Sequence, residues 1–277
     1  MFRIIVLMAI LLGGLWSTNA LSAECQTITC QEELAEQFAP ILRFDSKQGN
    51  KNKCFPGDAA EYYKARQSGD TSRICNEDYS SVTSGNVPTY YQYASNGFSE
   101  YIVYWFFYGW QDSCSPGVGT HDADWERIVV KLQDRFSTGN RAIVGVLFYQ
   151  HKGQYSKLAS YESEGDHPIV YVGKNSHGSY HDSGGTGTCC YWEDFRKPGS
   201  KNQRLETWHN LVRLVNNNNA PEWMRYEKSW DDWGADDGKV KGPLMRGEDL
   251  TRLKSCKGAL LKTCGTSGCA KSFSGTF

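Results

Sequence analysis

The sequence predicts a mainly β protein: an antiparallel β-sandwich with flanking helices, exported and stapled by disulfides. Three observations support this fold class: strand-like segments in the middle of the chain, an apolar N-terminal run, and ten cysteines that all follow that run. β-Branched and aromatic residues fill the strand-like segments, and turn-forming clusters separate them. Short strands spaced in this way favour two packed sheets.

The N-terminal segment is typical of a signal peptide. Arg3 supplies a positive start, residues 4–16 are apolar, and small residues follow as far as Ala23. The apolar run is shorter than the roughly 20 residues that a membrane span needs, although a retained anchor remains the alternative. We therefore expect residues 1–23 to be removed and the protein to be secreted, into the extracellular space or the periplasm.

The rest of the 277-residue chain suits one sandwich domain over 24–245, followed by a Cys-rich tail over 246–277. The chain carries 30 Lys and Arg against 31 Asp and Glu, a net charge of −1, and has no basic stripe. Nucleic acid is therefore not an expected partner. We expect a monomer.

The cysteines indicate disulfides, because an oxidising compartment lets such bonds persist. Sequence alone does not fix their connectivity. Closeness along the chain suggests Cys25–Cys30, Cys54–Cys75 and a bridge within the C-terminal trio. A zinc site is disfavoured, because the chain contains no CxxC pair.

The predicted elements follow in order along the chain. Leu34 and Phe38 have helical spacing and Pro40 follows, which predicts a short helix over 31–39. Residues 65–88 are rich in Ser, Asp, Asn and Gly and are expected to form mainly loops. Strands are predicted over 100–110, 125–132, 141–150 and 167–173. A packing helix is expected within 202–219, with an apolar stripe formed by Leu205, Trp208, Val212 and Val215.

The stretch "THDADWERIVV" (Thr120–Val130) joins an acidic cluster to a strand. In a strand that begins near Asp124, the side chains of Asp124 and Glu126 share one face, and Trp125 and Arg127 share the other. The two carboxylates would lie about 7 Å apart and repel each other unless a cation lies between them or one is protonated. The alternative is a polar turn in which Glu126 pairs with Arg127 or with another cation at the surface.

Further side chains surround this pair in the sequence. His121 stands three residues before Asp124, and Asp112 precedes the intervening loop. A set dominated by carboxylates favours Mg²⁺ or Ca²⁺, with Mn²⁺ possible, over zinc. His151, His177 and His181 follow predicted strands, where loop histidines are often functional, although solvated loops are equally compatible.

Common catalytic motifs are missing from the sequence. It has no G-x-S-x-G elbow, no HExxH and no Walker loop. Every cysteine has a plausible disulfide partner, which disfavours a thiol nucleophile. The catalytic hypothesis that remains is metal-assisted hydrolysis by the Asp/His/Glu set, with a bound water as nucleophile.

His121-x-x-Asp124-Trp125-Glu126 resembles the heptapeptide "GHRHDWE" of the necrosis-inducing cytolysins that oomycetes, fungi and bacteria secrete. The upstream "WQD", which ends in Asp112, resembles the segment that supplies their other metal-binding aspartate. The second histidine of the heptapeptide is replaced here by Ala123, which leaves open whether toxicity survives.

A second resemblance covers more of the chain. "LAEQFAPILRFD", "HDADWERIVV", "VYVGKNSHGSYHD" and "WGADDGKVKGP" look, in that order, like the vacuolar-protein-sorting-62-related family, whose function is poorly defined. Together the two resemblances span roughly residues 34–243. They imply that both families share a β-sandwich core around the motif. The tail after about residue 245 has no counterpart in either.

The resemblance implies a secreted sandwich whose acidic pocket holds a divalent cation and recognises the sugar headgroup of a membrane sphingolipid, after which the membrane is damaged without covalent chemistry. It implies metal ligation by Asp112, His121, Asp124 and Glu126, and ligand binding by His151, His177, Trp110 and Tyr180. Two alternatives stay open: a secreted metal-dependent hydrolase that uses the same carboxylates, and a non-toxic exported binding protein.

Overall fold

The structure is a computed structural model. It describes residues 25–46, 54–112, 119–134, 139–150, 153–184, 197–198, 203–235, 239–257 and 276–277. The predicted signal peptide, His151 and most of the predicted Cys-rich tail lie outside these residues. Within these ranges, no helix is long and apolar enough to cross a membrane.

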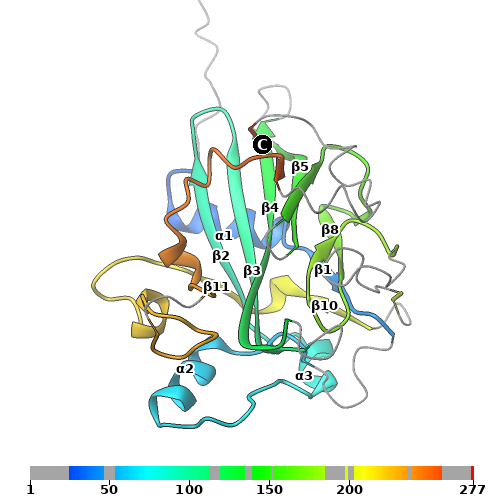
Figure 1. Cartoon of the computed structure of the whole chain (residues 1–277). Helices are drawn as coiled ribbons and strands as arrows, with labels where there is room; N and C mark the ends of the chain where they lie inside the picture. The colour runs from blue at the N-terminus through cyan, green and yellow to red at the C-terminus, as the bar shows by residue number, and fades with distance from the viewer. Residues whose placement is uncertain are drawn as a thin grey trace, which may run out of the picture.

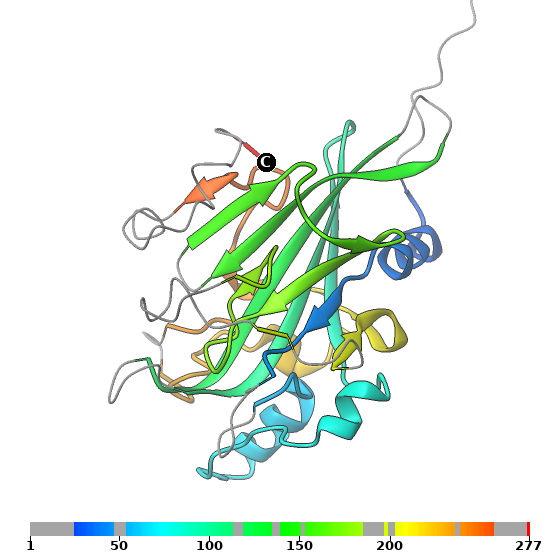
Figure 2. The same ribbon diagram turned by 90° about the vertical axis from the view of Figure 1, so that its right-hand side faces the viewer.

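Two β-sheets form the centre of the molecule, as predicted (Figures 1 and 2). The larger has seven strands in the order β11-β2-β3-β4-β5-β6-β12. Its strands are β2 (Thr89–Ser95), β3 (Glu100–Gln111), β4 (His121–Asp134), β5 (Arg141–Gln150), β6 (Gly153–Lys157), β11 (Leu211–Arg213) and β12 (Cys256–Lys257).

The smaller sheet has five strands, in the order β10-β1-β8-β7 with β9 also paired to β8. They are β1 (Ile41–Arg43), β7 (Ser163–Glu164), β8 (His167–Val172), β9 (Ser179–Tyr180) and β10 (Arg204–Glu206). Among the described strands, β1 runs parallel to β8 and β11 parallel to β2, and the other pairs are antiparallel. The predicted antiparallel sandwich therefore carries two parallel pairings.

The core between the sheets comes from alternate residues of the long strands. Ile128 and Val130 of β4 belong to the same buried cluster as Leu42 of β1 and Val170 of β8. This is the inner face of the large sheet. Burial of alternate apolar side chains fixes the strand register, because a slip of one residue would turn each side chain to the other face.

The outer face of the large sheet is buried as well. Trp125 and Val129 of β4 pack with Trp223, Trp230 and other side chains from the C-terminal third of the chain. Helix α2 (Ala59–Gln67) and the 3₁₀ turns η2 (Glu222–Arg225) and η3 (Pro243–Arg246) belong to this cover. Both faces of β4 are therefore interior.

In the described ranges, three α-helices flank the sheets. The predicted N-terminal helix is present as α1 (Ile28–Gln37), which begins earlier than expected because the Thr27 side chain accepts a hydrogen bond from the Cys30 N–H. Residues 65–88, expected to be mainly loops, include the end of α2 and the short helix α3 (Tyr79–Thr83). Asp58 caps α2 in the same way, by accepting from the Ala60 N–H.

The helix predicted within 202–219 is wrong. This segment forms β10, the 3₁₀ turn η1 (Thr207–Asn210) and β11. Leu205 pairs with Leu42 of the small sheet, and Val212 pairs with Tyr90 of the large sheet. The edges of both sheets supply backbone hydrogen bonds, so strand pairing overrides the helix-like spacing of the apolar residues.

Disulfides join Cys25 to Cys30 and Cys54 to Cys75, which confirms the two local pairings. Cys256 is also disulfide-bonded. Residues of the predicted tail join the main fold, because β12 pairs with β6 and the Phe277 side chain is buried in the outer-face core.

One glycine allows a close crossing at the end of β3. A Cβ at Gly109 would lie 2.3 Å from the carbonyl oxygen of Ile74, a distance that no real contact allows. The chain after α2 can therefore cross directly against β3 only because this position has no side chain.

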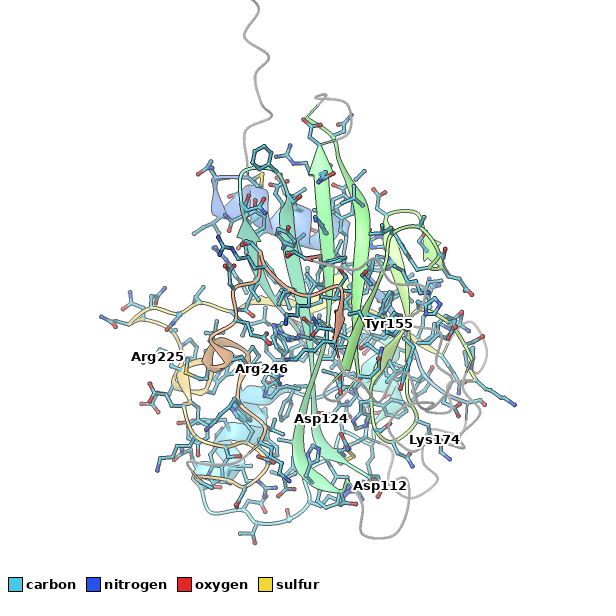
Figure 3. All side chains as sticks on the ribbon, turned by 45° about the horizontal axis from the view of Figure 1, so that its top comes forward. Asp112, Asp124, Tyr155, Lys174, Arg225 and Arg246 are labelled. Atoms are coloured by element: carbon cyan, nitrogen blue, oxygen red, sulfur yellow. A yellow bond between two sulfur atoms is a disulfide. The ribbon has the colours of Figure 1, made fainter. Side chains whose placement is uncertain are left out.

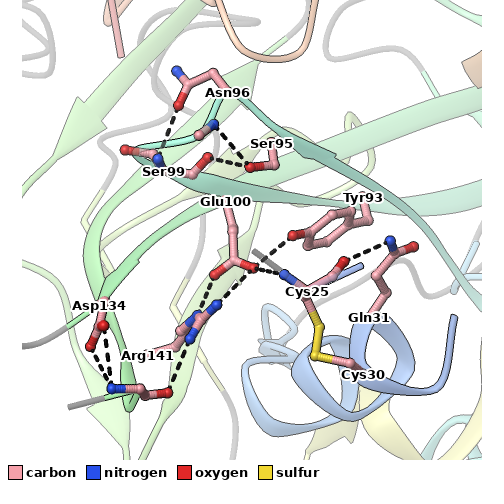
Figure 4. A network of polar contacts seen from close by, with 12 residues as sticks. Cys25, Cys30, Gln31, Tyr93, Ser95, Asn96, Ser99, Glu100, Asp134 and Arg141 are labelled. Carbon is pink, nitrogen blue, oxygen red and sulfur yellow. Dashed lines mark hydrogen bonds and ion pairs between the residues drawn. A yellow bond between two sulfur atoms is a disulfide. The ribbon is translucent and has the colours of Figure 1, made fainter. Parts of the chain in front are cut away.

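A buried ion pair joins the segment just before α1 to the large sheet (Figure 4). Glu100 is 5% exposed and accepts hydrogen bonds from the Arg141 guanidinium, the Tyr93 hydroxyl and the Cys25 N–H. Burial acts to raise the pKa of Glu100, but these hydrogen bonds outweigh it, so that its pKa is lowered. A lowered pKa makes the charged carboxylate a source of stability.

We expect Glu100→Gln to lower the free energy of unfolding by about 3 kcal/mol at neutral pH, because Arg141 would be left without its charged partner. The stabilisation by Glu100 is present above the unfolded-state pKa, near 4.3, and is lost as pH falls through the lower folded-state pKa. Urea unfolding of both proteins between pH 3 and 7 should therefore show the difference shrinking in acid. Glu77→Gln, in an exposed pair with Arg73, is the control, and a constant difference across this range would contradict the prediction.

Candidate functional site

The acidic pair of β4 lies on the inner face, as strand alternation predicts. Asp124 and Glu126 precede Ile128 and Val130 on that face and are 7% and 5% exposed. Strand geometry separates the two positions by about 7 Å. Figure 3 shows Asp124 towards the lower end of the large sheet, with Asp112 beyond it. Two buried carboxylates therefore share one end of the layer between the sheets.

Arg127 does not neutralise this pair. It lies on the outer face, where its guanidinium stacks over Trp105 and Tyr149 and forms a bidentate ion pair with Glu248. The alternative in which Glu126 pairs with Arg127 is therefore excluded. On the outer face, the charge of Arg127 is balanced by Glu248.

His177 approaches the acidic pair from the loop after β8. Its Nδ1 lies 3.1 Å from Oδ2 of Asp124, and its ring stacks on Tyr108 with the centroids 3.8 Å apart and the planes within 2°. Its backbone has φ +60°, as does that of nearby Asn175 at +66°, so this turn uses the left-handed region without glycine. Such strain is frequent at functional sites, where the surrounding structure holds it.

Tyr108 brings a hydroxyl to the same place, since it pairs with Asp124 across β3 and β4. Burial raises its pKa well above the ordinary value, and the negative charges of Glu126 and Asp124 add to the rise. The tyrosine is therefore neutral at every physiological pH and can donate a hydrogen bond.

Gln150 and Ser179 add further buried polar side chains to the layer between the sheets, near Asp124 and Glu126. Phe148 of β5 pairs with Ile128 of β4, and the two strands are antiparallel. Gln150, two residues beyond Phe148, therefore lies at the level of Glu126. Its side-chain amide donates to the Ser179 carbonyl at 2.7 Å. Four buried atoms here have no hydrogen-bond partner among the residues that the structure describes: Tyr108 Oη, His177 Nε2, Gln150 Oε1 and Ser179 Oγ. A buried polar atom left unpaired costs about 1–3 kcal/mol, so this layer is chemically suited to polar guests.

Other predicted metal ligands lie differently. Nδ1 of His121 is 2.8 Å from the Ala123 carbonyl oxygen, and the Asp112 N–H donates to the Asn175 carbonyl at the base of the His177 loop. Within the described residues, no three His, Cys, Asp or Glu side chains gather closely enough to hold a metal ion. The structure thus places Asp124 beside His177 and on the same strand face as Glu126. Asp112 and His121 lie near the same strand ends, but among the described residues these side chains do not form a complete ligand set.

The rest of the motif has structural partners. Asp122, which the sequence interpretation left out of the metal set, forms an ion pair with Arg66 of α2 at 2.9 Å. Ala123 has φ +47° and is fully buried in the outer-face core. The position of the heptapeptide's second histidine is therefore an apolar interior position in this protein.

The predicted ligand-binding aromatics Tyr180 and Trp110 have other neighbours. Tyr180 is 2% exposed and packs with Ile41, Ile169 and Tyr171, in a cluster separate from the inner core. Trp110 is half-buried beneath the Arg73 guanidinium, 5.6 Å from its ring centre. Sequence reasoning missed Tyr108, Gln150 and Ser179, although strand register from Asp124 and Glu126 would have pointed to the first two.

Comparisons with known proteins match more than half of the chain to one family model. The family model for necrosis inducing protein (NPP1) matches residues 32–229. A solved structure of necrosis and ethylene inducing protein 2, from the causal agent of cocoa's witches' broom disease, is 19% identical over 69% of this chain and 74% of that chain, with a TM-score of 0.39. No curated protein sequence is significantly similar to the chain.

Two further solved structures are similar to the same extent. NLPPya in complex with glucosamine is 19% identical over 69% of this chain and 76% of that chain, with a TM-score of 0.39. The non-toxic HaNLP3 protein is 18% identical over 64% of this chain and 80% of that chain, with a TM-score of 0.38.

We expect Tyr108→Phe to be as stable as the wild type or more stable, because it removes a buried hydroxyl without a partner and keeps the stack on His177. Tyr108→Leu should lower the free energy of unfolding by about 1–3 kcal/mol, because the ring contact is lost. Denaturant unfolding of the metal-free protein compares the two. Equal destabilisation by both substitutions would show that the hydroxyl, rather than the stacked ring, stabilises the fold.

Proposed function

The chain belongs to the necrosis-inducing protein (NPP1) family, and on that premise we propose that it is a secreted, cation-dependent cytolysin that binds the sugar headgroup of a membrane glycolipid. The observation that carries the proposal is the buried acidic pair Asp124 and Glu126 at one end of the inter-sheet layer. Two buried carboxylates at this spacing repel each other, and a divalent cation between them relieves that repulsion.

The donor atoms fit a hard cation. Asp124 and Glu126 supply carboxylate oxygens, and the unpaired side-chain oxygens of Gln150 and Ser179 lie on the same inner layer. Oxygen donors of this kind suit Mg²⁺ or Ca²⁺, with Mn²⁺ also compatible. When bound, such an ion balances the carboxylates and offers open coordination positions to sugar hydroxyls.

The protein's own residues would then hold and orient the site. His177 keeps Asp124 in place through Nδ1, in the way that outer residues fix metal-ligating side chains. Tyr108 holds the His177 ring flat by stacking, and the Asp112 N–H ties the strand end to the His177 loop. Asp112 and His121 remain the proposed further ligands, which requires their side chains to turn towards Asp124 when the cation binds.

We expect Asp124→Asn and Glu126→Gln each to weaken Mg²⁺ binding at least tenfold, because each removes one anionic ligand. Isothermal titration calorimetry of protein stripped with EDTA measures this. The same variants should lose Mg²⁺-dependent dye leakage from phosphatidylcholine vesicles that contain a glycosylated sphingolipid. Glu227→Gln, at an exposed position, is the control and should behave as the wild type.

Wild-type Mg²⁺ binding and leakage in both variants would refute the proposed site. Leakage that needs no divalent cation would refute the cation dependence. Turnover of a phosphoryl or glycosyl substrate that disappears in the same variants would instead identify a metal-dependent hydrolase.

A further inference from the structure

A polar groove lies at the β11 end of the large sheet, several strands' width from β5 and its Gln150. It encloses about 270 Å³ between α1, β2 and the segment from η1 to β11. Its lining residues are Glu32, Glu36, Tyr91, Trp208, Leu211 and Arg213. Tyr91 pairs with Tyr104, four residues along β3 from Tyr108, so the groove is separate from the candidate cation site.

The walls of the groove carry opposite charges. Glu32 and Glu36 lie one helical turn apart on α1, both exposed, and neither forms an ion pair with any described residue. Like charges at this spacing repel each other slightly in a bare helix. Arg213 faces the groove from β11, and its guanidinium donates to the Gln31 side chain at 2.7 Å, which fixes its position.

A buried hydroxyl marks the floor. Tyr91 is 2% exposed, and its Oη has no hydrogen-bond partner within the described part of the chain. The pKa of Tyr91 is raised to about 12, chiefly by burial and also by the charge of Glu32, while Arg213 acts to lower it. The hydroxyl therefore lies within electrostatic reach of both walls, where a guest in the groove can pair with it.

Trp208 supplies a rigid aromatic surface. One side of its indole stacks on His167, with ring centroids 4.0 Å apart, and the ring remains half-buried beside the carboxylates of α1. An indole next to carboxylates is suited to an organic cation, above all to a quaternary ammonium group. A guanidinium is suited to a phosphate.

We propose that this groove binds a zwitterion whose ammonium and phosphate groups are a few atoms apart, of the phosphocholine type. The ammonium group would lie against Trp208, Glu32 and Glu36, and the phosphate against Arg213 and the Tyr91 hydroxyl. A simple cation would leave Arg213 without an anionic partner in the groove, and a simple anion would be repelled by the two glutamates. The same chemistry occurs in a free metabolite and in a phospholipid headgroup.

Calorimetric titration with free phosphocholine in EDTA tests the groove without the cation site. We expect tighter binding of phosphocholine than of choline or inorganic phosphate. The Kd should rise at least about fivefold in Glu32→Gln/Glu36→Gln and in Arg213→Gln, each of which removes one charged contact. Tyr91→Phe should also weaken binding without loss of thermal stability, because it removes only the unpaired hydroxyl.

Glu33→Gln is the matched control, since Glu33 is exposed on α1 but does not line the groove. Equal affinity for phosphocholine, choline and phosphate, or unchanged affinity in the charge variants, would overturn the proposal. Sedimentation with phosphatidylcholine vesicles, against phosphatidylglycerol vesicles, separates the sources: binding to the former assigns a lipid headgroup, and binding of free phosphocholine alone assigns a soluble ligand. Running both arms in Asp124→Asn keeps this result independent of the proposed cytolytic function.

Discussion

Burial of both faces of β4 is the constraint on which the rest of the structure depends. Ile128 and Val130 are committed to the layer between the sheets, and Trp125 and Val129 to the layer beneath the C-terminal cover. If a strand that is buried on both sides slipped by one residue, each of its side chains would move into the buried layer on the opposite face. Each layer must therefore neutralise its own charges. The outer layer does so with Arg127 and Glu248, while the inner layer holds two carboxylates beside His177.

The assignment of side chains to the two faces of β4 could be predicted from the sequence, because side chains alternate between the faces of a strand. Alternation from Asp124 assigned the carboxylates and the tryptophan to opposite faces, and the structure confirms both assignments. Closeness along the chain sufficed for the pairs Cys25–Cys30 and Cys54–Cys75. These features depend on neighbours in sequence, which is why the residues alone reveal them.

Features that depend on distant partners could not be predicted in the same way. The stack of Tyr108 on His177 joins residues 69 positions apart. The segment after residue 203 forms strands because it pairs with β1 of the small sheet and β2 of the large sheet. Asp122 was left out of the metal set from the sequence, but its ion-pair partner, Arg66 of α2, could be identified only from the structure. Trp208 was assigned to a packing stripe, and its place between His167 and the groove follows from η1 rather than from a helix.

The close crossing at Gly109 can serve to sort relatives of this protein. Any larger residue there would drive the Ile74 carbonyl away from β3 and carry Arg73, which covers Trp110, along with it. A related chain with a side chain at the corresponding position must therefore route the segment after α2 differently and leave this end of its sheet more open. One alignment column would thus separate family members that share the crossing from those that lack it, before any of their structures is known.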